Sequence, residues 1–353
     1  MKERLNVLVL GVGGNVSQGI LKALKLASIP CRVIGGCVSP LSMGLYTVDQ
    51  AYVSPAANHA SFFEWLLQTC KTERVDAVLS GVEPVLEVLS AHADELRAET
   101  GAVAIVSAPG VLEIGADKLR TCEWLREHGF NYPDFADATD RATLEQLANR
   151  CGYPLLAKPR RGKGGYGIAI VRDSRELEPW IGRSDYVIEE YLGDDSTEYT
   201  VGCFSGRDGK VLGAIAMWRE LLQGTTYRAV VGEFPELRDE AVRIVEALKP
   251  FGPCNVQLRM SKGQAACFEI NVRFSGTTSL RARFGFNDVE AALRHYVLSE
   301  DTVSLPRVTE GIALRYWNEV YIDPGARTAL EKSGALANPQ KYASHVEDYG
   351  VKA

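Results

Sequence analysis

The sequence predicts a two-part molecule, an α/β lobe with a parallel sheet followed by an α+β body. Strand and helix signals alternate along the first third of the chain, which is typical of parallel strands joined by crossover helices. Strand signals then dominate from 153 to 275, with one helix among them. The composition, 46% hydrophobic and 24% charged over 353 residues, provides enough apolar side chains for a large core.

The elements of the first lobe follow from its apolar runs. Short apolar runs predict strands, and the longer segments between them predict helices. The expected strands are 6–10, 31–34, 76–80 and 102–106, and the expected helices are 17–26, 62–70 and 85–97. This order predicts a Rossmann-like lobe over 1–108.

The body begins after Pro109. Asp117 is the predicted N-cap of a helix over 118–128, which Gly129 ends. The expected strands are 154–159, 167–172, 185–192, 198–204, 211–219, 255–260 and 265–274, and the expected helices are 236–249 and 288–299. Residues 301–353 show no pattern that we can interpret.

Several classes of protein are disfavoured. No apolar run reaches the roughly 18–20 residues of a membrane-spanning helix, so we expect no membrane association. The eight cysteines form no Cys-x-x-Cys pair and the five histidines are scattered, which predicts neither a zinc site nor disulfides and favours the reducing cytoplasm. A net charge of −6 and the lack of a Lys/Arg-rich run argue against a nucleic-acid partner.

A first glycine-rich loop, 11–19, follows a strand and opens a helix. It lacks the dinucleotide fingerprint because Val16 stands where a glycine is needed. A tight turn is the favoured interpretation, and binding of a substrate anion at Gly14 and Asn15 is the alternative. Glu83 follows the strand 76–80, where a substrate contact competes with an ordinary loop.

A second glycine-rich segment, 160–167, joins two predicted strands as a hairpin. Its glycines allow backbone N–H groups to turn toward an anion. Lys158, Arg161 and Lys163 add positive charge, which suits a triphosphate. The alternative is a solvated hairpin with incidental charges.

The strand 265–274 carries a polar face. Alternation places Glu269, Asn271 and Arg273 on one side and apolar residues on the other. Mg²⁺ prefers oxygen ligands, and the strand 255–260 could add the amide of Gln257. A solvent-facing strand would show the same alternation.

In chain order, these signals resemble the ATP-grasp superfamily, and within it one synthetase half of the carbamoyl-phosphate synthase large subunit. The resemblance covers about 5–300 and is carried best by 255–257, 269–276 and the hairpin after Lys158. It implies a Rossmann-like pre-ATP-grasp domain (1–108), a linker helix and small lobe with a glycine-rich lid (109–185), a large lobe with hinge and metal site (186–300), and a C-terminal extension of unknown role (301–353).

The resemblance also implies roles for single residues in binding ATP and magnesium. The phosphate-contacting lysines would be Lys118 and Lys158, and the lid glycines Gly162, Gly164, Gly165 and Gly167. The hinge at adenine would be Glu189, Glu190, Tyr191 and Leu192, with Glu198 at the ribose. The ligands of two Mg²⁺ ions, for which Mn²⁺ could substitute, would be Gln257, Glu269 and Asn271.

The remaining roles concern the reaction. By the same resemblance, Arg273 would be catalytic together with Lys158 and would grip an acyl phosphate. Arg281 and Arg283 could meet the incoming carboxylate, with salt bridges as the alternative. Arg219, before the loop at 224–226, lies where relatives often have a substrate-side loop, with a plain hairpin as the alternative.

The expected function is that of an ATP-dependent carboxylate–amine ligase that uses a small-molecule carboxylate and a small-molecule amine. The alternatives are a phosphotransferase that stops at an acyl or carbamoyl phosphate, a nucleotide-binding module without turnover, and a Rossmann-type oxidoreductase. The identity of the acid and the amine stays open, as does a homodimer.

Overall fold

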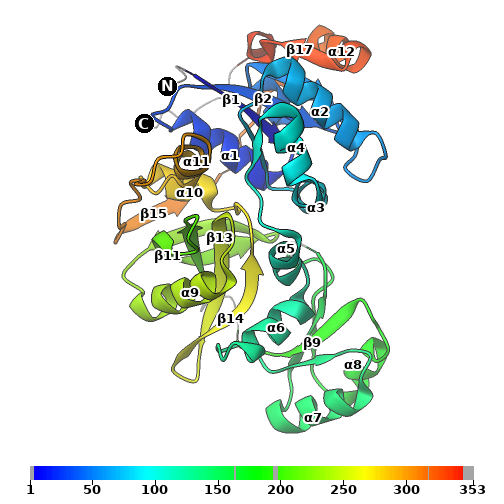
Figure 1. Ribbon diagram of the computed structural model, residues 1–353. Helices are drawn as coiled ribbons and strands as arrows, with labels where there is room; N and C mark the ends of the chain where they lie inside the picture. The colour runs from blue at the N-terminus through cyan, green and yellow to red at the C-terminus, as the bar shows by residue number, and fades with distance from the viewer. Residues whose placement is uncertain (1–3, 163, 194–197, 317, 345–353) are drawn as a thin grey trace.

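The computed structural model describes residues 4–162, 164–193, 198–316 and 318–344. The described residues form two six-stranded sheets, one four-stranded sheet and one two-stranded sheet. The three larger sheets belong to an N-terminal lobe, a small lobe and a large lobe (Figure 1). The predicted combination of a parallel α/β lobe with an α+β body is confirmed.

The N-terminal sheet has the order β17-β3-β2-β1-β4-β5, and its first five strands in the chain are parallel. Val7 and Val9 pack into one apolar cluster, and Leu8 and Leu10 pack into another. Both faces of β1 are therefore covered, which explains its continuous apolar sequence. The elements are β1 (Leu5–Leu10), α1 (Asn15–Lys25), β2 (Cys31–Cys37), η1 (Met43–Tyr46), β3 (Gln50–Val53), α2 (Phe62–Glu73), β4 (Ala77–Ser80), α3 (Glu83–Ala91), α4 (Ala93–Thr100) and β5 (Val103–Ala104).

The C-terminal segment returns to this first sheet. Strand β17 (Ala335–Ala337) pairs antiparallel with β3, and α12 (Pro324–Ser333) buries Leu330 against the same lobe. The short ladder β16 (Tyr321–Ile322) with β18 (Ala343–Ser344) lies nearby in the chain, as does η5 (Pro339–Tyr342). The sequence did not predict this return, because strands of two or three residues have no readable period.

The small lobe contains the sheet β6-β9-β7-β8. Strand β9 pairs with β7 from Leu155 to Pro159, so this sheet extends to Glu190, beyond the expected boundary at 185. Helices α5 (Pro109–Ala116) and α6 (Lys118–Glu127) lead into the lobe. Its elements are β6 (Phe135–Asp137), α7 (Arg141–Cys151), β7 (Leu155–Pro159), β8 (Ala169–Val171), α8 (Ser174–Leu177), η2 (Glu178–Trp180) and β9 (Tyr186–Glu190).

The large lobe is an antiparallel sheet with the order β14-β13-β10-β11-β12-β15. Helix α9 covers one face with Ile244 and Val245, and the opposite face carries the polar residues described below. Its elements are β10 (Glu198–Ser205), β11 (Val211–Leu222), β12 (Thr225–Val231), α9 (Pro235–Leu248), β13 (Gly252–Ser261), β14 (Gln264–Asn271), α10 (Thr278–Arg283), α11 (Asp288–Ala292), the π-helix η4 (Leu293–Val297) and β15 (Gly311–Leu314).

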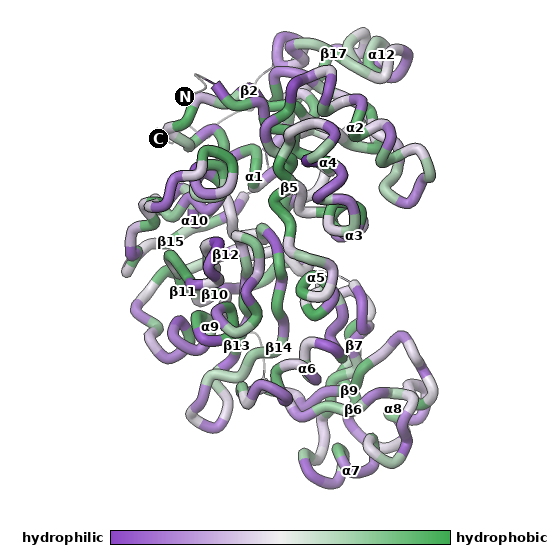
Figure 2. Tube along the Cα trace, viewed as in Figure 1, coloured by the Kyte–Doolittle hydropathy of each residue, from purple (hydrophilic) through white to green (hydrophobic). Residues whose placement is uncertain are grey.

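Hydropathy follows this layering. Figure 2 shows the chain around β5 as hydrophobic and much of α4 as hydrophilic, in line with one buried residue, Leu96, on that helix. Among the described residues, no helix is both long enough and apolar enough to cross a membrane.

Candidate active site

Strand β14 presents the polar face that its alternation predicts. Asn271 donates from Nδ2 to Glu269 Oε1 at 3.2 Å. On β13, Gln257 lies opposite Glu269, and Asn255 lies opposite Asn271. The amide and carboxylate oxygens of two neighbouring strands are therefore brought to one place.

Glu269 is the only carboxylate in this set of three predicted metal ligands. Burial raises its pKa, but Lys118, Arg219, Lys158 and Arg273 together hold the pKa below its usual value. The carboxylate is thus ionised at neutral pH. Asn271 uses its amide nitrogen toward Glu269, and the oxygen of Gln257 accepts from Arg219 Nη2 at 2.8 Å. Carboxylate and amide oxygens suit a hard cation such as Mg²⁺, but Arg219 has to release Gln257 before that oxygen can bind one.

Lys158 approaches this face from β7. Its Nζ donates to Glu189 Oε2 at 2.7 Å and lies 5.1 Å from the centre of the Phe268 ring. Burial lowers the pKa of Lys158, but Glu189 opposes that effect and the net pKa is raised. The side chain of Glu189 therefore keeps a buried lysine charged, a role that the sequence did not predict for the hinge.

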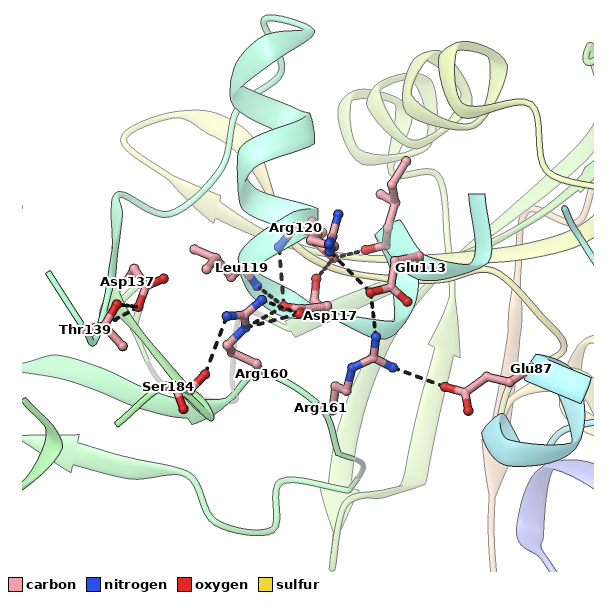
Figure 3. A network of polar contacts seen from close by, with 12 residues as sticks. Glu87, Glu113, Asp117, Leu119, Arg120, Asp137, Thr139, Arg160, Arg161 and Ser184 are labelled. Carbon is pink, nitrogen blue, oxygen red and sulfur yellow. Dashed lines mark hydrogen bonds and ion pairs between the residues drawn. The ribbon is translucent and has the colours of Figure 1, made fainter. Parts of the chain in front are cut away.

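The second predicted lysine, Lys118, is the first residue of α6, directly after the N-cap Asp117. Asp117 accepts the backbone N–H of Leu119 at 3.0 Å and pairs with Arg160 Nη2 at 2.6 Å (Figure 3). Burial raises the pKa of Asp117, but Arg160 and the backbone donors lower it overall. Lys118 Nζ lies 3.5 Å from the carbonyl oxygen of Gly162, so it borders the base of the glycine-rich loop.

The glycine-rich loop needs its glycines. Gly162, Gly164, Gly165 and Gly167 have φ values of 145°, 67°, 72° and 78°, which other residues rarely adopt. A Cβ atom at Gly224, in the β11–β12 turn, would lie 2.1 Å from the Gly164 carbonyl oxygen. The loop therefore rests closely on that turn.

Arg161, expected to add positive charge near the phosphates, pairs with two carboxylates. Its Nη1 lies 3.1 Å from Glu87 and its Nη2 lies 2.6 Å from Glu113, as Figure 3 shows. The guanidinium group of Arg161, which we expected to contact an anionic ligand, therefore already pairs with two carboxylates of the protein. Lys163, expected beside it, lies outside the described residues.

Glu198, expected at the ribose, is buried between two arginines. Its Oε1 accepts from Arg219 Nε at 2.9 Å, and its Oε2 accepts from Arg259 Nη2 at 2.9 Å. Arg219 also donates to Gln257 Oε1 at 2.8 Å. Arg219 therefore belongs to the face that carries the predicted metal ligands. Arg259 was missed, although it shares the alternation of Gln257.

The remaining hinge residues lie at the end of β9. Glu190 Oε1 accepts from Lys262 at 2.9 Å, and the backbone N–H of Glu190 donates to Asp134 at 2.7 Å. Tyr191 and Leu192 follow as partly exposed loop residues. The segment thus connects the small lobe to the β13–β14 hairpin.

The N-terminal lobe reaches the end of β14. Arg273 Nη2 donates to Glu83 Oε1 at 3.0 Å. Asn15, at the start of α1 after Gly14, accepts at Oδ1 from Arg315 at 3.5 Å, and Arg315 also donates to the Gly276 carbonyl at 2.8 Å. The predicted substrate residues of the first lobe therefore lie beside the loop that follows β14.

Arg281 and Arg283 have different surroundings. Arg281 is fully buried and contacts Asp288, Asn255 and Ser275, which favours the structural ion pair over a substrate contact. Arg283 is exposed on α10. Arg315, which the sequence did not indicate, instead donates to Asn15 and to the Gly276 carbonyl.

Two family models match the chain. Residues 7–105 match the PylC-like N-terminal domain, and residues 183–320 match the family described as ATP-grasp in the biosynthetic pathway with Ter operon. The chain carries an ATP-grasp domain. The predicted superfamily is therefore confirmed, and the first lobe is of the PylC-like type.

Curated proteins that are similar to this chain include carbamoyl phosphate synthase large chains. That of Methanosarcina barkeri is 24% identical over 304 residues, which is 78% of this chain and 28% of the relative. That of Corynebacterium glutamicum is 25% identical over 83% of this chain and 28% of the relative. The chain thus spans a little over a quarter of the length of these proteins.

Solved structures share the fold. The biotin carboxylase domain dimer of the Hydrogenobacter thermophilus 2-oxoglutarate carboxylase, with MgADP, ADP and bicarbonate, gives a TM-score of 0.65 at 19% identity, covering 86% of this chain and 71% of that chain. The L-amino acid ligase of Bacillus licheniformis gives 0.63 at 20% identity, covering 84% and 75%. An N5-carboxyaminoimidazole ribonucleotide synthetase with ADP gives 0.66 at 13% identity, covering 82% and 76%.

Proposed function

We propose that the chain is an ATP-dependent, ADP-forming carboxylate–amine ligase of small molecules that acts through an acyl phosphate. One observation carries the proposal: Lys118, Lys158, Arg219 and Arg273 converge on the carboxylate of Glu269 and lower its pKa. Cations gathered around a candidate metal ligand suit a polyphosphate with its metal ions.

The relatives support this class of reaction. The ATP-grasp neighbours include a synthetase with ADP, a carboxylase domain with MgADP and an L-amino acid ligase. Because the chain covers only 28% of the carbamoyl phosphate synthase of Methanosarcina barkeri, the reaction of that whole enzyme is not carried over.

We assign the nucleotide to the space between the small and large lobes, within the domain division given by the sequence. Lys118, Lys158 and the lid glycines would bind phosphate oxygens, residues 189–192 would meet adenine, and Glu198 would meet the ribose. Gln257, Glu269 and Asn271 would hold two Mg²⁺ ions, with Mn²⁺ as a substitute. Bound Mg²⁺ would supply neutralisation of the phosphate charge.

In the reaction, a carboxylate oxygen of the first substrate attacks the γ-phosphorus of ATP, and the bond from that phosphorus to the ADP oxygen breaks. The nitrogen of the amine then attacks the acyl carbon, loses a proton and displaces phosphate. Arg273 stabilises the charge on the transferred phosphoryl group. The glycine-rich loop excludes water, which would otherwise hydrolyse the acyl phosphate.

The test is Mg²⁺-dependent ADP release from ATP across a panel of amino acids and small carboxylates, offered singly and in pairs. We expect release that requires both an acid and an amine. Release with an acid alone would favour the phosphotransferase, which stops at the acyl phosphate. ATP binding without release under any condition would contradict the ligase and favour a nucleotide-binding module.

Two further points belong to the proposal. A homodimer is supported by the dimeric biotin carboxylase neighbour, and light scattering after gel filtration would test it.

A location in the reducing cytoplasm is supported by the eight free cysteines, of which Cys70, Cys122 and Cys254 are fully buried or nearly so.

A further inference from the structure

Arg315 is a partly buried cation between the N-terminal and large lobes. It directly follows β15, and its backbone N–H donates to the Tyr227 carbonyl at 2.8 Å. Its guanidinium donates to the Gly276 carbonyl at 2.8 Å and to Asn15 Oδ1 at 3.5 Å. Both acceptors are neutral, and within 4–162, 164–193, 198–316 and 318–344 no carboxylate forms an ion pair with Arg315.

The charge of Arg315 is therefore not compensated locally. Burial alone lowers its pKa, without a carboxylate that opposes the effect. The pKa of Lys22, on α1, is lowered by burial and then by Arg315, so a second cation lies near the first. Removing a cation from water without a counter-ion is unfavourable, and an anionic ligand at this place would relieve that cost.

Glu83 provides a negative charge at the same boundary between the N-terminal and large lobes. Its Oε1 accepts from Arg273, and its side chain keeps 32% of its accessible surface. The loop before Glu83 packs on the turn that precedes α1, because a Cβ atom at Gly11 would lie 2.3 Å from Val82 Cγ2. Glu83 and Arg315 thus both border the turn that ends at Asn15.

The two nearby arginines suggested by the sequence do not provide this charge. Arg281 is neutralised by Asp288 inside the protein, and Arg283 is exposed on α10. Arg315 is the arginine that combines partial burial with neutral partners beside the loop after β14.

We propose that Arg315 binds the carboxylate of an amino-acid substrate and that Glu83 binds its ammonium group. This inference rests on the proposed ligase function and names the class of one of its substrates. An amino acid carries the two charges that match the two side chains. An acid without the ammonium group would offer Glu83 no cation beyond Arg273, and an amine without the carboxylate would leave Arg315 without its anion.

The experiment measures binding by calorimetry with MgADP present. The probes are the twenty proteinogenic L-amino acids and, for the tightest of them, its primary amide and its des-amino acid. The amide lacks the negative charge and the des-amino acid lacks the positive one. For the wild-type chain, we expect the amino acid to bind at least about tenfold tighter than either analogue.

Two variants separate the two contacts. Arg315→Met should weaken binding of the amino acid by about 10–100-fold and abolish the discrimination against the amide, while the preference over the des-amino acid persists. Glu83→Gln should show the reverse pattern. A purely structural role of either residue would weaken all three probes equally.

The controls keep the result interpretable. Arg327→Met removes an exposed arginine of the same C-terminal segment, paired with Glu331, and should leave all three affinities unchanged. Affinity for ADP should be unchanged in every variant. If Arg315→Met does not fold, Arg315→Lys keeps the charge without the planar fork and should show a smaller loss of the same kind.

The outcomes distinguish the two levels of the proposal. Equal binding of the amino acid and its analogues, or an Arg315→Met chain with unchanged discrimination, overturns this inference. ADP release that requires an acid and an amine would still support the ligase in that case. If no amino acid binds and no acid elicits ADP release from bound ATP, both proposals fail.

Discussion

Two charge clusters lie along β13 and β14, and they differ in exposure. The Arg281 cluster, formed by Arg281, Asp288, Asn255, Ser275, Thr277 and Thr278, encloses one cation and one carboxylate. A side chain at Gly202 would collide with Arg281, since a Cβ atom there would lie 2.4 Å from Nη1. Arg281 therefore packs directly on β10, and both members of its ion pair are enclosed by protein.

The Glu269 cluster, formed by Glu269, Lys118, Lys158, Arg219 and Arg273, has four cations around one carboxylate. Glu189, Glu198 and Glu83 compensate three of these cations individually, and the face keeps partial exposure at Glu269. The comparison teaches that a fully enclosed ion pair stabilises a fold, whereas a cluster that keeps one carboxylate accessible is arranged for a charged ligand.

The largest expected effect is on catalysis in the open cluster. Glu269→Gln removes the one carboxylate among the metal ligands, and we expect Mg²⁺-dependent ADP release to fall by about 10²–10³-fold or more. The fold should persist, as measured by circular dichroism. Undiminished ADP release would contradict the assignment of the site.

Substitutions in the Arg281 cluster should instead lower the free energy of unfolding. Arg281→Met leaves Asp288 without its partner inside the protein, and we expect a loss of about 3–5 kcal/mol in the free energy of unfolding by urea titration. Arg283→Met, an exposed neighbour, should stay within about 0.5 kcal/mol. A small effect of Arg281→Met would show that the two clusters do not differ as argued.

A double variant sharpens this contrast. Arg281→Met with Asp288→Leu removes both charges and should recover much of the lost stability, because apolar replacements of a buried ion pair are often well tolerated. No recovery would mean that the hydrogen bonds to Thr277 and Thr278, more than the ion pair, stabilise this region.

The glycine-rich loop should show an intermediate effect. Gly224→Ala places a Cβ atom against the Gly164 carbonyl, and we expect the KM for ATP to rise by about tenfold because the loop cannot rest on the β11–β12 turn. Gly263→Ala is the matched control, since its φ of 79° is also positive but no atom lies within 4 Å of its Cβ position. Equal KM values for the two variants would contradict a role of the contact in ATP binding.

The smallest effect concerns the pair Asp117–Arg160, which is balanced like the Arg281 cluster but partly open. The pKa of Asp117 is lowered on folding, so its contribution to stability is present above the usual carboxyl pKa of about 4 and is lost as the pH falls through the lower folded value. Asp117→Asn keeps a good N-cap and should therefore flatten the acid side of the stability profile.

Thermal unfolding between pH 2 and 7 checks this prediction. Wild type and Asp117→Asn should differ most near neutral pH and converge at the acid end. Parallel profiles over the whole range would show that Asp117 acts through its hydrogen bonds to the helix rather than through its charge.

Local patterns in the sequence predicted much of the fold and part of the site. The alternation in 265–274 placed Glu269 and Asn271 on one face, because the period of a strand depends only on neighbouring residues. The spacing from Asp117 predicted the start of α6 for the same reason. Short elements such as β6 and β15 were not predicted, since three or four residues cannot establish a period.

The sequence by itself determined the two-part architecture, the superfamily and the polar face of β14. Only the tertiary structure decided which side chains pair with one another. Lys158 pairs with Glu189, Glu198 pairs with Arg219, and Arg315 donates to Asn15, which lies 300 residues away in the chain. Those partners depend on strand pairing and on lobe packing. Distant segments pair because complete strands and helices bury their apolar faces against one another, and a local pattern of residues does not specify which elements will pack together.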